Sequence, residues 1–140
     1  MNDSKLVSER IVRSYELDSF GHVNNAVYLQ YCEGARNDYL KQRGIQFSNF
    51  RSWNVGPVLY HAAVDYKRQA RADDLLHIEG ILTFKGKTRF HIEHKMIRQS
   101  DQALVCAASL DFAFVNLTTQ RPCKVPEEFL KAFRVMSPKS

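Results

Sequence analysis

Residues 15–40 read YELDSFGHVNNAVYLQYCEGARNDYL and join a polar turn to a long, largely apolar segment. Asp18 stands just before a glycine, a histidine and two asparagines, and apolar side chains then recur at helical spacing. Asn24 or Asn25 can cap a helix over about residues 26–43, and the glycine that follows favours its end. The stretch therefore predicts a turn that carries polar side chains to the start of a helix.

The predicted helix has more apolar positions than a surface helix normally shows. They are Val27, Tyr28, Leu29, Tyr31, Cys32, Ala35, Tyr39 and Leu40. Because a surface helix buries a single stripe of side chains, this broad apolar surface predicts a helix wrapped by a sheet.

The rest of the chain is typical of strands. Residues 8–16 predict an edge strand, and residues 45–57, with their aromatics, Asn, Gly and Pro, predict an ordered loop. Four long strand candidates then follow, at 58–69, 75–84, 88–98 and 103–117, and we expect them to form an antiparallel meander. A turn signal precedes each of the last three strand candidates, at residues 72–74, 85–87 and 100–102.

A short helix is expected over residues 126–133, where a proline and two glutamates suit a helix start. One long helix against one antiparallel sheet makes an α+β domain, which spans residues 1–140 as a single unit. Because such a sheet leaves an unpaired edge strand, we expect a homodimer or a homotetramer.

Composition narrows the class of protein. The 140-residue chain is 44% hydrophobic and 25% charged, which is typical of a folded globular domain. Three cysteines without CxxC spacing, and an N-terminus without an apolar core, favour a cytoplasmic protein. No apolar run approaches the roughly 20 residues of a membrane-spanning helix. The net charge of +5 favours an anionic partner, but scattered basic residues without a zinc-finger or phosphate-loop motif argue against nucleic acid.

The pattern Y-x-x-D-x-x-G-H-V-N-N-x-x-Y-L-x-Y-x-E-x-A-R over residues 15–36 resembles hot-dog-fold acyl-CoA thioesterases of the 4-hydroxybenzoyl-CoA thioesterase type. Weaker agreement in VDYKRQARADDLL and LDFAFVNLTTQRPCKVPEEF extends the likeness to roughly residues 8–129. The resemblance implies a hot-dog fold, in which an antiparallel sheet wraps one long central helix. It also implies two subunits joined into one sheet, active sites at their interface, and neither a metal nor an organic cofactor.

The resemblance assigns roles to the polar turn. It implies that the Asp18 carboxylate attacks the thioester carbonyl or deprotonates the attacking water, while the backbone N–H of Asn25 polarises the carbonyl oxygen. The residue chemistry agrees, because the free N–H groups of a helix start can hold a developing oxyanion and an ordinary carboxylate is ionised at neutral pH. His22 either orients the water or Asp18, or hydrogen-bonds within the turn.

Other readings of these residues stay open. Asp18 is also suited to an ordinary loop or a helix cap. Plant acyl-carrier-protein thioesterases have a helpful asparagine two residues after the acid, but Phe20 stands there in this chain. Glu33 is a rival acid, since another hot-dog thioesterase group uses a helix glutamate, but we expect it to form an ion pair with Arg36 instead.

Two further groups are assigned to structure rather than chemistry. His91, Glu93 and His94 lie in HIEH on a predicted strand, where alternation places the two histidines on opposite faces and disfavours a shared metal site. Cys32 lies among apolar helix positions without an evident base, so we expect a core residue and not a nucleophile.

The function that these observations favour is an acyl-CoA thioesterase, which hydrolyses an acyl-CoA thioester to the free acid and CoA. Four basic residues are candidates to bind the CoA phosphates, unless they simply form a solvated strand face: Lys67, Arg68, Arg71 and Arg89. The alternative is a non-catalytic hot-dog protein that binds acyl-CoA or acyl-carrier protein.

Overall fold

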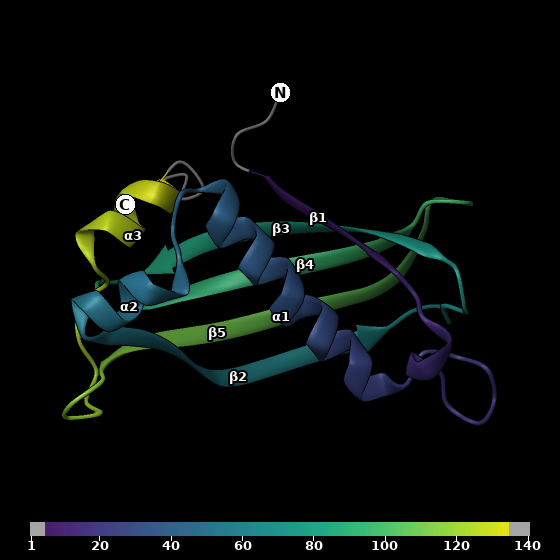
Figure 1. The fold of residues 1–140 in the computed structure, drawn as a ribbon, viewed down its shortest axis with the longest axis horizontal. Helices are drawn as coiled ribbons and strands as arrows, with labels where there is room; N and C mark the ends of the chain where they lie inside the picture. Colours follow the sequence, from purple (N-terminus) through teal and green to yellow (C-terminus); the bar gives the residue numbers. More distant parts are fainter. Residues whose placement is uncertain (1–4, 135–140) are drawn as a thin grey trace.

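The computed structural model describes residues 5–134 as one antiparallel sheet with a long helix laid across one face (Figure 1). The strands are β1 (Leu6–Ile11), β2 (Val55–Tyr66), β3 (Leu75–Lys85), β4 (Arg89–Arg98) and β5 (Ala103–Asn116). The helices are α1 (Asn25–Gln42), α2 (Phe47–Trp53), α3 (Glu127–Phe133) and the short 3-10 helix η1 (Ser14–Glu16). The α+β architecture predicted from the sequence is confirmed. None of the helices in residues 5–134 combines the length and apolar character needed to cross a membrane.

The strand order is β1-β3-β4-β5-β2, and every neighbouring pair is antiparallel. Strands β3, β4 and β5 form the predicted meander, and their turns lie where the sequence placed them. The expectation for β2 was wrong, because β2 pairs with β5 instead of β3. The other side of β3 is taken by β1, so the connection 67–74 carries the chain from β2, at one edge of the sheet, past β5 and β4 to β3, which lies next to the opposite edge strand.

Helix α1 begins and ends as its local sequence predicts. The Asn24 side chain caps it by accepting a hydrogen bond from the N–H of Ala26 at 2.9 Å, and Gly44 follows its end with a φ of 78°. Its buried face is Tyr28, Tyr31, Cys32, Ala35 and Tyr39, which confirms a helix packed against a sheet.

Two segments near α1 differ from the sequence prediction. The edge strand ends at Ile11, and residues 14–16 form η1, where the Glu16 carboxylate accepts the N–H of Arg13 at 2.8 Å. The segment 45–57 is not a loop: it contains α2 and the first residues of β2. Local capping explains this helix, because the Asn49 side chain accepts the N–H of Gln46 at 2.8 Å and the left-handed Asn54, with φ 57°, ends it.

Many aromatic rings of the core lie where α2 and α3 meet the sheet; Figure 1 shows these two helices at the left. Phe129 of α3 packs against Phe90, Phe114 and Phe133 with ring centroids 4.8–5.2 Å apart. At its opposite end α1 meets η1 and the loop that contains Asp18, and the aromatic packing there is between tyrosines: Tyr28 lies 6.1 Å from Tyr31 and 5.5 Å from Tyr66 between ring centroids. The two ends of one helix therefore lie in different environments.

Strand β2 forms one edge of the sheet, and α1 leaves part of it uncovered. Leu59, Ala62 and Val64 lie opposite buried β5 residues in the register and so face the α1 side. Leu59 is nevertheless 42% exposed, Ala62 is exposed, and Val64 is half-buried. We call these three residues the β2 strip; it is apolar surface that remains open in a single chain.

Candidate functional site

Asp18 lies in a tight turn between η1 and α1. The backbone N–H groups of Phe20 and His22 donate to Asp18 Oδ1 at 2.9 and 3.1 Å, and the N–H of Asp18 donates to the carbonyl of His22 at 2.7 Å. Gly21 has a φ of 81°, which only glycine adopts without strain, and so allows the turn to close. The turn fixes the carboxylate, and Asp18 Oδ2 has no hydrogen-bond partner in residues 5–134.

The same turn sets the charge state of Asp18. Hydrogen bonds from the backbone N–H of His22 and then of Phe20 favour the ionised form and hold the pKa of Asp18 below its usual value of 3.8. The Asp18 residue is exposed to solvent. Asp18 is therefore a carboxylate at neutral pH, as the sequence predicted.

The start of α1 leaves one backbone donor free. The two N–H groups that follow Asn25 both donate to Asn24: that of Ala26 to its side-chain oxygen and that of Val27 to its carbonyl, each at 2.9 Å. Within the described part of the chain, the N–H of Asn25 has no partner. It lies at the positive end of the helix dipole, where a negatively charged oxygen is stabilised.

Long-range hydrogen bonds hold this helix start in place. The hydroxyl of Tyr66, at the end of β2, donates to the carbonyl of Asn25 at 3.1 Å. The N–H of Val23 donates to Ala70 at 3.0 Å, and the N–H of Asn24 donates to Glu16 at 3.0 Å. The free N–H of Asn25 therefore belongs to an anchored element, as an oxyanion donor must.

Asp18 and Asn25 line one cleft of about 410 Å³. Its lining residues are Asp18, His22, Val23, Asn25, Tyr28, Tyr66, Lys67, Arg68 and Gln69. The structure thus brings the three predicted catalytic residues together with two of the predicted substrate-binding residues. Sequence reasoning missed Tyr66 and Gln69 as lining residues, although both stand next to the basic pair in VDYKRQ.

Lys67 and Arg68 directly follow β2 at the mouth of this cleft. Their backbone N–H groups both donate to the carbonyl of Val105, at 2.8 and 3.1 Å, which fixes the main chain while both side chains are exposed. Neither side chain takes part in the ion pairs formed among residues 5–134. Two cations that form no ion pair within residues 5–134 therefore line the same cleft as the carboxylate of Asp18.

The other two predicted basic residues lie elsewhere. Arg71 is in the turn that leads to β3, where its N–H donates to the side chain of Asp74 at 2.9 Å. Arg89, the first residue of β4, lies opposite Ala113 of β5. Tyr66 lies opposite a β5 residue seven positions away from Ala113, so Arg89 and Tyr66 are about 23 Å apart along the strand direction. Neither Arg71 nor Arg89 lines the cleft in a single chain.

Glu33 and Cys32 were the other candidates for the catalytic side chain, and the structure places both outside the cleft. Glu33 does not line this cleft, and the ion pairs of the described residues do not include the expected Glu33–Arg36 pair. Cys32 is buried as predicted, and burial raises the pKa of its thiol to about 11, so it is not a thiolate at neutral pH.

The HIEH segment has the predicted alternation. His91 bonds Asp111 at 2.7 Å on the outer face, while His94 is 1% exposed on the inner face beside Tyr39. Burial lowers the pKa of His94 to about 3, so this imidazole is neutral. In residues 5–134 no group of three or more His, Cys, Asp or Glu side chains is placed to hold a metal ion.

Comparison with known proteins agrees with this architecture. Residues 12–133 match the thioesterase-like superfamily. The chain is 30% identical to the long-chain acyl-CoA thioesterase FadM of Escherichia coli K12, over 89% of this chain and 94% of that protein. It is 56% identical to the Arabidopsis thaliana chloroplastic acyl-acyl carrier protein thioesterase ATL2, over 87% of this chain. The chain spans 64% of the length of ATL2 and of its Arabidopsis relative ATL3.

Solved structures show the same fold. A 1,4-dihydroxy-2-naphthoyl-CoA thioesterase from Synechocystis superposes with a TM-score of 0.87 at 21% identity, covering 93% of this chain and 96% of its own. The fold is therefore the hot-dog fold that the resemblance implied. Since the superfamily match extends over most of the sequence, the chain belongs to the thioesterase-like superfamily.

Proposed function

We propose that the chain is an acyl-CoA thioesterase whose catalytic groups are the Asp18 carboxylate and the backbone N–H of Asn25. The observation that carries this proposal is the single cleft in which an ionised carboxylate lies with a free helix-start donor. The family supports hydrolysis of a thioester, and FadM is by name an acyl-CoA thioesterase.

Two routes use these groups. As a general base, Asp18 takes a proton from water while the water oxygen bonds to the thioester carbon, and the proton then goes to the departing CoA sulfur. As a nucleophile, Asp18 bonds to the carbonyl carbon and expels the CoA thiolate, and water hydrolyses the resulting anhydride. In both routes the carbonyl oxygen becomes negative and accepts the N–H of Asn25, a donor worth about 10²- to 10³-fold in rate. A single turnover in ¹⁸O-water that labels the Asp18 carboxylate would assign the nucleophilic route.

His22 is proposed to support Asp18 rather than to replace it. Its backbone N–H is one of the two donors that lower the pKa of Asp18, and its side chain lines the same cleft. His22→Ala keeps the backbone donor, so a large loss of kcat in this variant would assign a role to the imidazole itself.

The CoA part of the substrate is proposed to lie over Lys67 and Arg68. CoA carries a pyrophosphate and a ribose phosphate, and Arg and Lys bind phosphate oxygens through charge-assisted hydrogen bonds. Both side chains are exposed at the cleft and form no ion pair among residues 5–134. The position of the pair suits a substrate whose thioester enters the cleft and whose nucleotide stays outside.

A homodimer, or a pair of dimers, is proposed from the edge of the sheet. β2 is twelve residues long, pairs only with β5 on one side, and exposes Val58, Leu59 and Tyr60. An edge of this length and apolar character favours pairing with a second copy. Sedimentation velocity at assay concentrations tests this: an active monomer would contradict it.

The thioesterase proposal is tested with a panel of aromatic and aliphatic acyl-CoA thioesters, with release of free CoA thiol as the signal. We expect turnover of at least one substrate without added metal. The competing proposal, a hot-dog protein that binds acyl-CoA or acyl-carrier protein without turnover, predicts saturable binding of the same thioesters and no thiol release. Pure protein that binds but does not release thiol would overturn the enzymatic assignment.

A further inference from the structure

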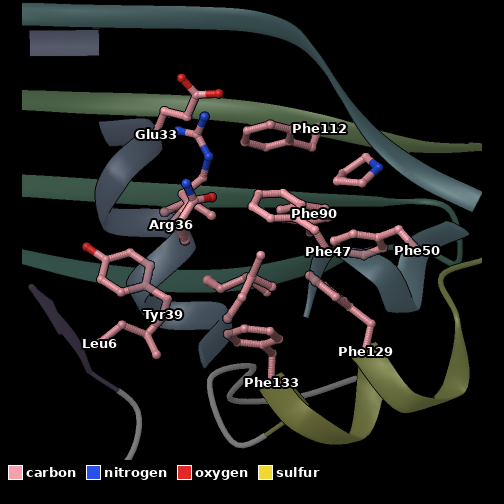
Figure 2. A pocket seen from close by; sticks show the side chains of 15 residues that line it. Leu6, Glu33, Arg36, Tyr39, Phe47, Phe50, Phe90, Phe112, Phe129 and Phe133 are labelled. Carbon is pink, nitrogen blue, oxygen red and sulfur yellow. The ribbon is translucent and has the colours of Figure 1, made fainter. Parts of the chain in front are cut away.

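A second cavity, of about 170 Å³, lies under the other half of α1 (Figure 2). Aromatic side chains from α2, α3, β4 and β5 surround it, and its charged lining residues are Glu33 and Arg36 of α1. Figure 2 shows the guanidinium of Arg36 beside the ring of Phe112. This cavity shares no lining residue with the cleft that contains Asp18.

Arg36 is incompletely satisfied in this position. Its guanidinium carbon lies 4.9 Å from the centroid of the Phe112 ring, so one face of the cation is covered by an aromatic group. Arg36 Nη1 is buried and has no hydrogen-bond partner in residues 5–134. Burial lowers the pKa of Arg36, but an arginine stays protonated in proteins. A buried, charged donor without an acceptor is costly, so an acceptor is expected when the site is occupied.

Water alone is a poor occupant of this cavity. A buried water needs two to four polar partners, and the polar lining residues all belong to α1, at Glu33, Arg36, Asn37 and Tyr39, whereas the residues that line the cavity from the sheet, α2 and α3 are aromatic or aliphatic. A volume of about 170 Å³ also holds several non-hydrogen atoms, since one water occupies about 30 Å³ of liquid. The lining therefore fits a group that is mainly apolar and carries one acceptor oxygen.

The β2 strip lies between the two sites along β2. Tyr66 lines the cleft and Pro57 lines the cavity, and both lie on β2, on the side that faces α1. The β2 strip lies between them and is apolar and partly open. Along α1, Asn25 and Arg36 are about 16 Å apart, a distance that an extended aliphatic acyl chain can span.

We propose that the cavity at Arg36 receives the far end of the acyl group, and that Arg36 Nη1 selects acyl chains with a neutral acceptor oxygen there, a hydroxyl or a ketone. The inference rests on the proposed thioesterase function and names the class of acyl group. A carboxylate is disfavoured because the Glu33 carboxylate lines the same cavity and would repel it. Arg36 is thus a specificity-determining residue, remote from the reacting carbon.

The test compares kcat/KM for ω-hydroxydodecanoyl-CoA and dodecanoyl-CoA in three proteins. The wild type is expected to prefer the hydroxylated substrate by about tenfold or more, as one hydrogen bond to a charged donor provides. Arg36→Met, which keeps the length of the side chain, is expected to lose that preference. Arg43→Met is the matched control, because Arg43 stacks on Phe133 and donates to the carbonyl of Ala132 but does not line the cavity. It should keep the preference.

Equal kcat/KM ratios in wild type and Arg36→Met would overturn the inference, as would a preference for dodecanedioyl-CoA over the hydroxylated substrate. If Arg36→Met does not fold, as judged by near-ultraviolet circular dichroism, Arg36→Lys replaces it. That variant keeps the charge but moves the donor, and it should reduce the same ratio.

Binding without turnover separates this inference from the proposed function. The shift in melting temperature is measured with ω-hydroxydodecanoate and with dodecanoate, on wild type and on Arg36→Met. A larger shift with the hydroxy acid that disappears in Arg36→Met supports the inference even if no thioester is hydrolysed. Hydrolysis of thioesters together with identical shifts for both acids would leave the thioesterase intact and overturn the inference.

Discussion

The two ends of α1 differ in the groups that surround them. At the start of the helix, the unpaired backbone N–H of Asn25, the carboxylate of Asp18 and two cations that form no ion pair within residues 5–134 line an open cleft. Toward the far end, aromatic rings of α2 and α3 pack against one another and against rings of β4 and β5. The difference predicts that the aromatic end contributes more to stability than the polar end, where we propose that the reaction takes place.

The largest effect on stability is expected from Phe129→Ala at the aromatic end. Phe129 is 2% exposed and contacts rings of β4, β5 and α3, so its removal should lower the free energy of unfolding by about 3–5 kcal/mol. Urea unfolding measures this. Phe20→Ala is the matched control, because Phe20 lies in the Asp18 turn with 82% of its surface exposed and should change the free energy by less than about 0.5 kcal/mol. Similar losses in both variants would contradict the comparison.

A smaller effect on stability is expected at the start of the helix. Asn24→Ala removes the side-chain acceptor for the N–H of Ala26 and should lower the free energy of unfolding by about 0.5–2 kcal/mol. Asn24→Ser can still cap the helix and should keep most of that stability. Because the cap also helps to position the N–H of Asn25, kcat should fall in Asn24→Ala. A stable Asn24→Ala protein with unchanged kcat would separate the cap from the oxyanion site.

A modest change in KM is expected at the basic pair. Arg68 is exposed, so Arg68→Ala should raise KM for an acyl-CoA by about two- to fivefold and have less effect on an acyl-pantetheine without the nucleotide. Arg71→Ala is the control outside the cleft and should leave both KM values unchanged. Equal increases with both substrates would indicate a structural role for Arg68.

The smallest effect is expected from mild acid. The pKa of Asp18 is lowered by its backbone donors, so the reactive carboxylate is present above that pKa and is lost only as the pH falls through it. Asp18 should therefore cause no loss of kcat/KM between neutral pH and about pH 5, while the fold persists. A pH–rate profile with circular dichroism at each point measures this. An acid limb above about pH 5 in folded protein, absent in His22→Ala, would assign that limb to the histidine.

The elements with strong local signals were predictable. The cap at Asn24, the glycine after α1 and the alternation in β3 to β5 act within a few residues, so their consequences can be read from the chain. The placement of β2 beside β5 depends on long-range pairing, which local sequence does not specify. Helix α2 was missed because its capping by Asn49 and Asn54 occurs in a segment whose composition is typical of loops.

The site was predictable to the extent that it is local. Asp18, His22 and Asn25 belong to one short motif, so their closeness in the structure could be predicted from the sequence. Tyr66 reaches Asn25 from the end of β2, and Arg36 lies over the ring of Phe112 with its Nη1 buried and unpaired within residues 5–134. These contacts join residues far apart in the chain, so they follow from packing and not from a motif.

The central claim is that the Asp18 carboxylate carries out the reaction while contributing little to the fold. The most direct measurement is kcat of Asp18→Asn on a substrate of the wild type, with urea unfolding on the same sample. Asparagine keeps the size of the side chain and an acceptor oxygen for the turn but removes the charge. We predict a loss of kcat of at least about 10²-fold with little change in KM or stability. Near-wild-type kcat in a folded Asp18→Asn protein would contradict the account.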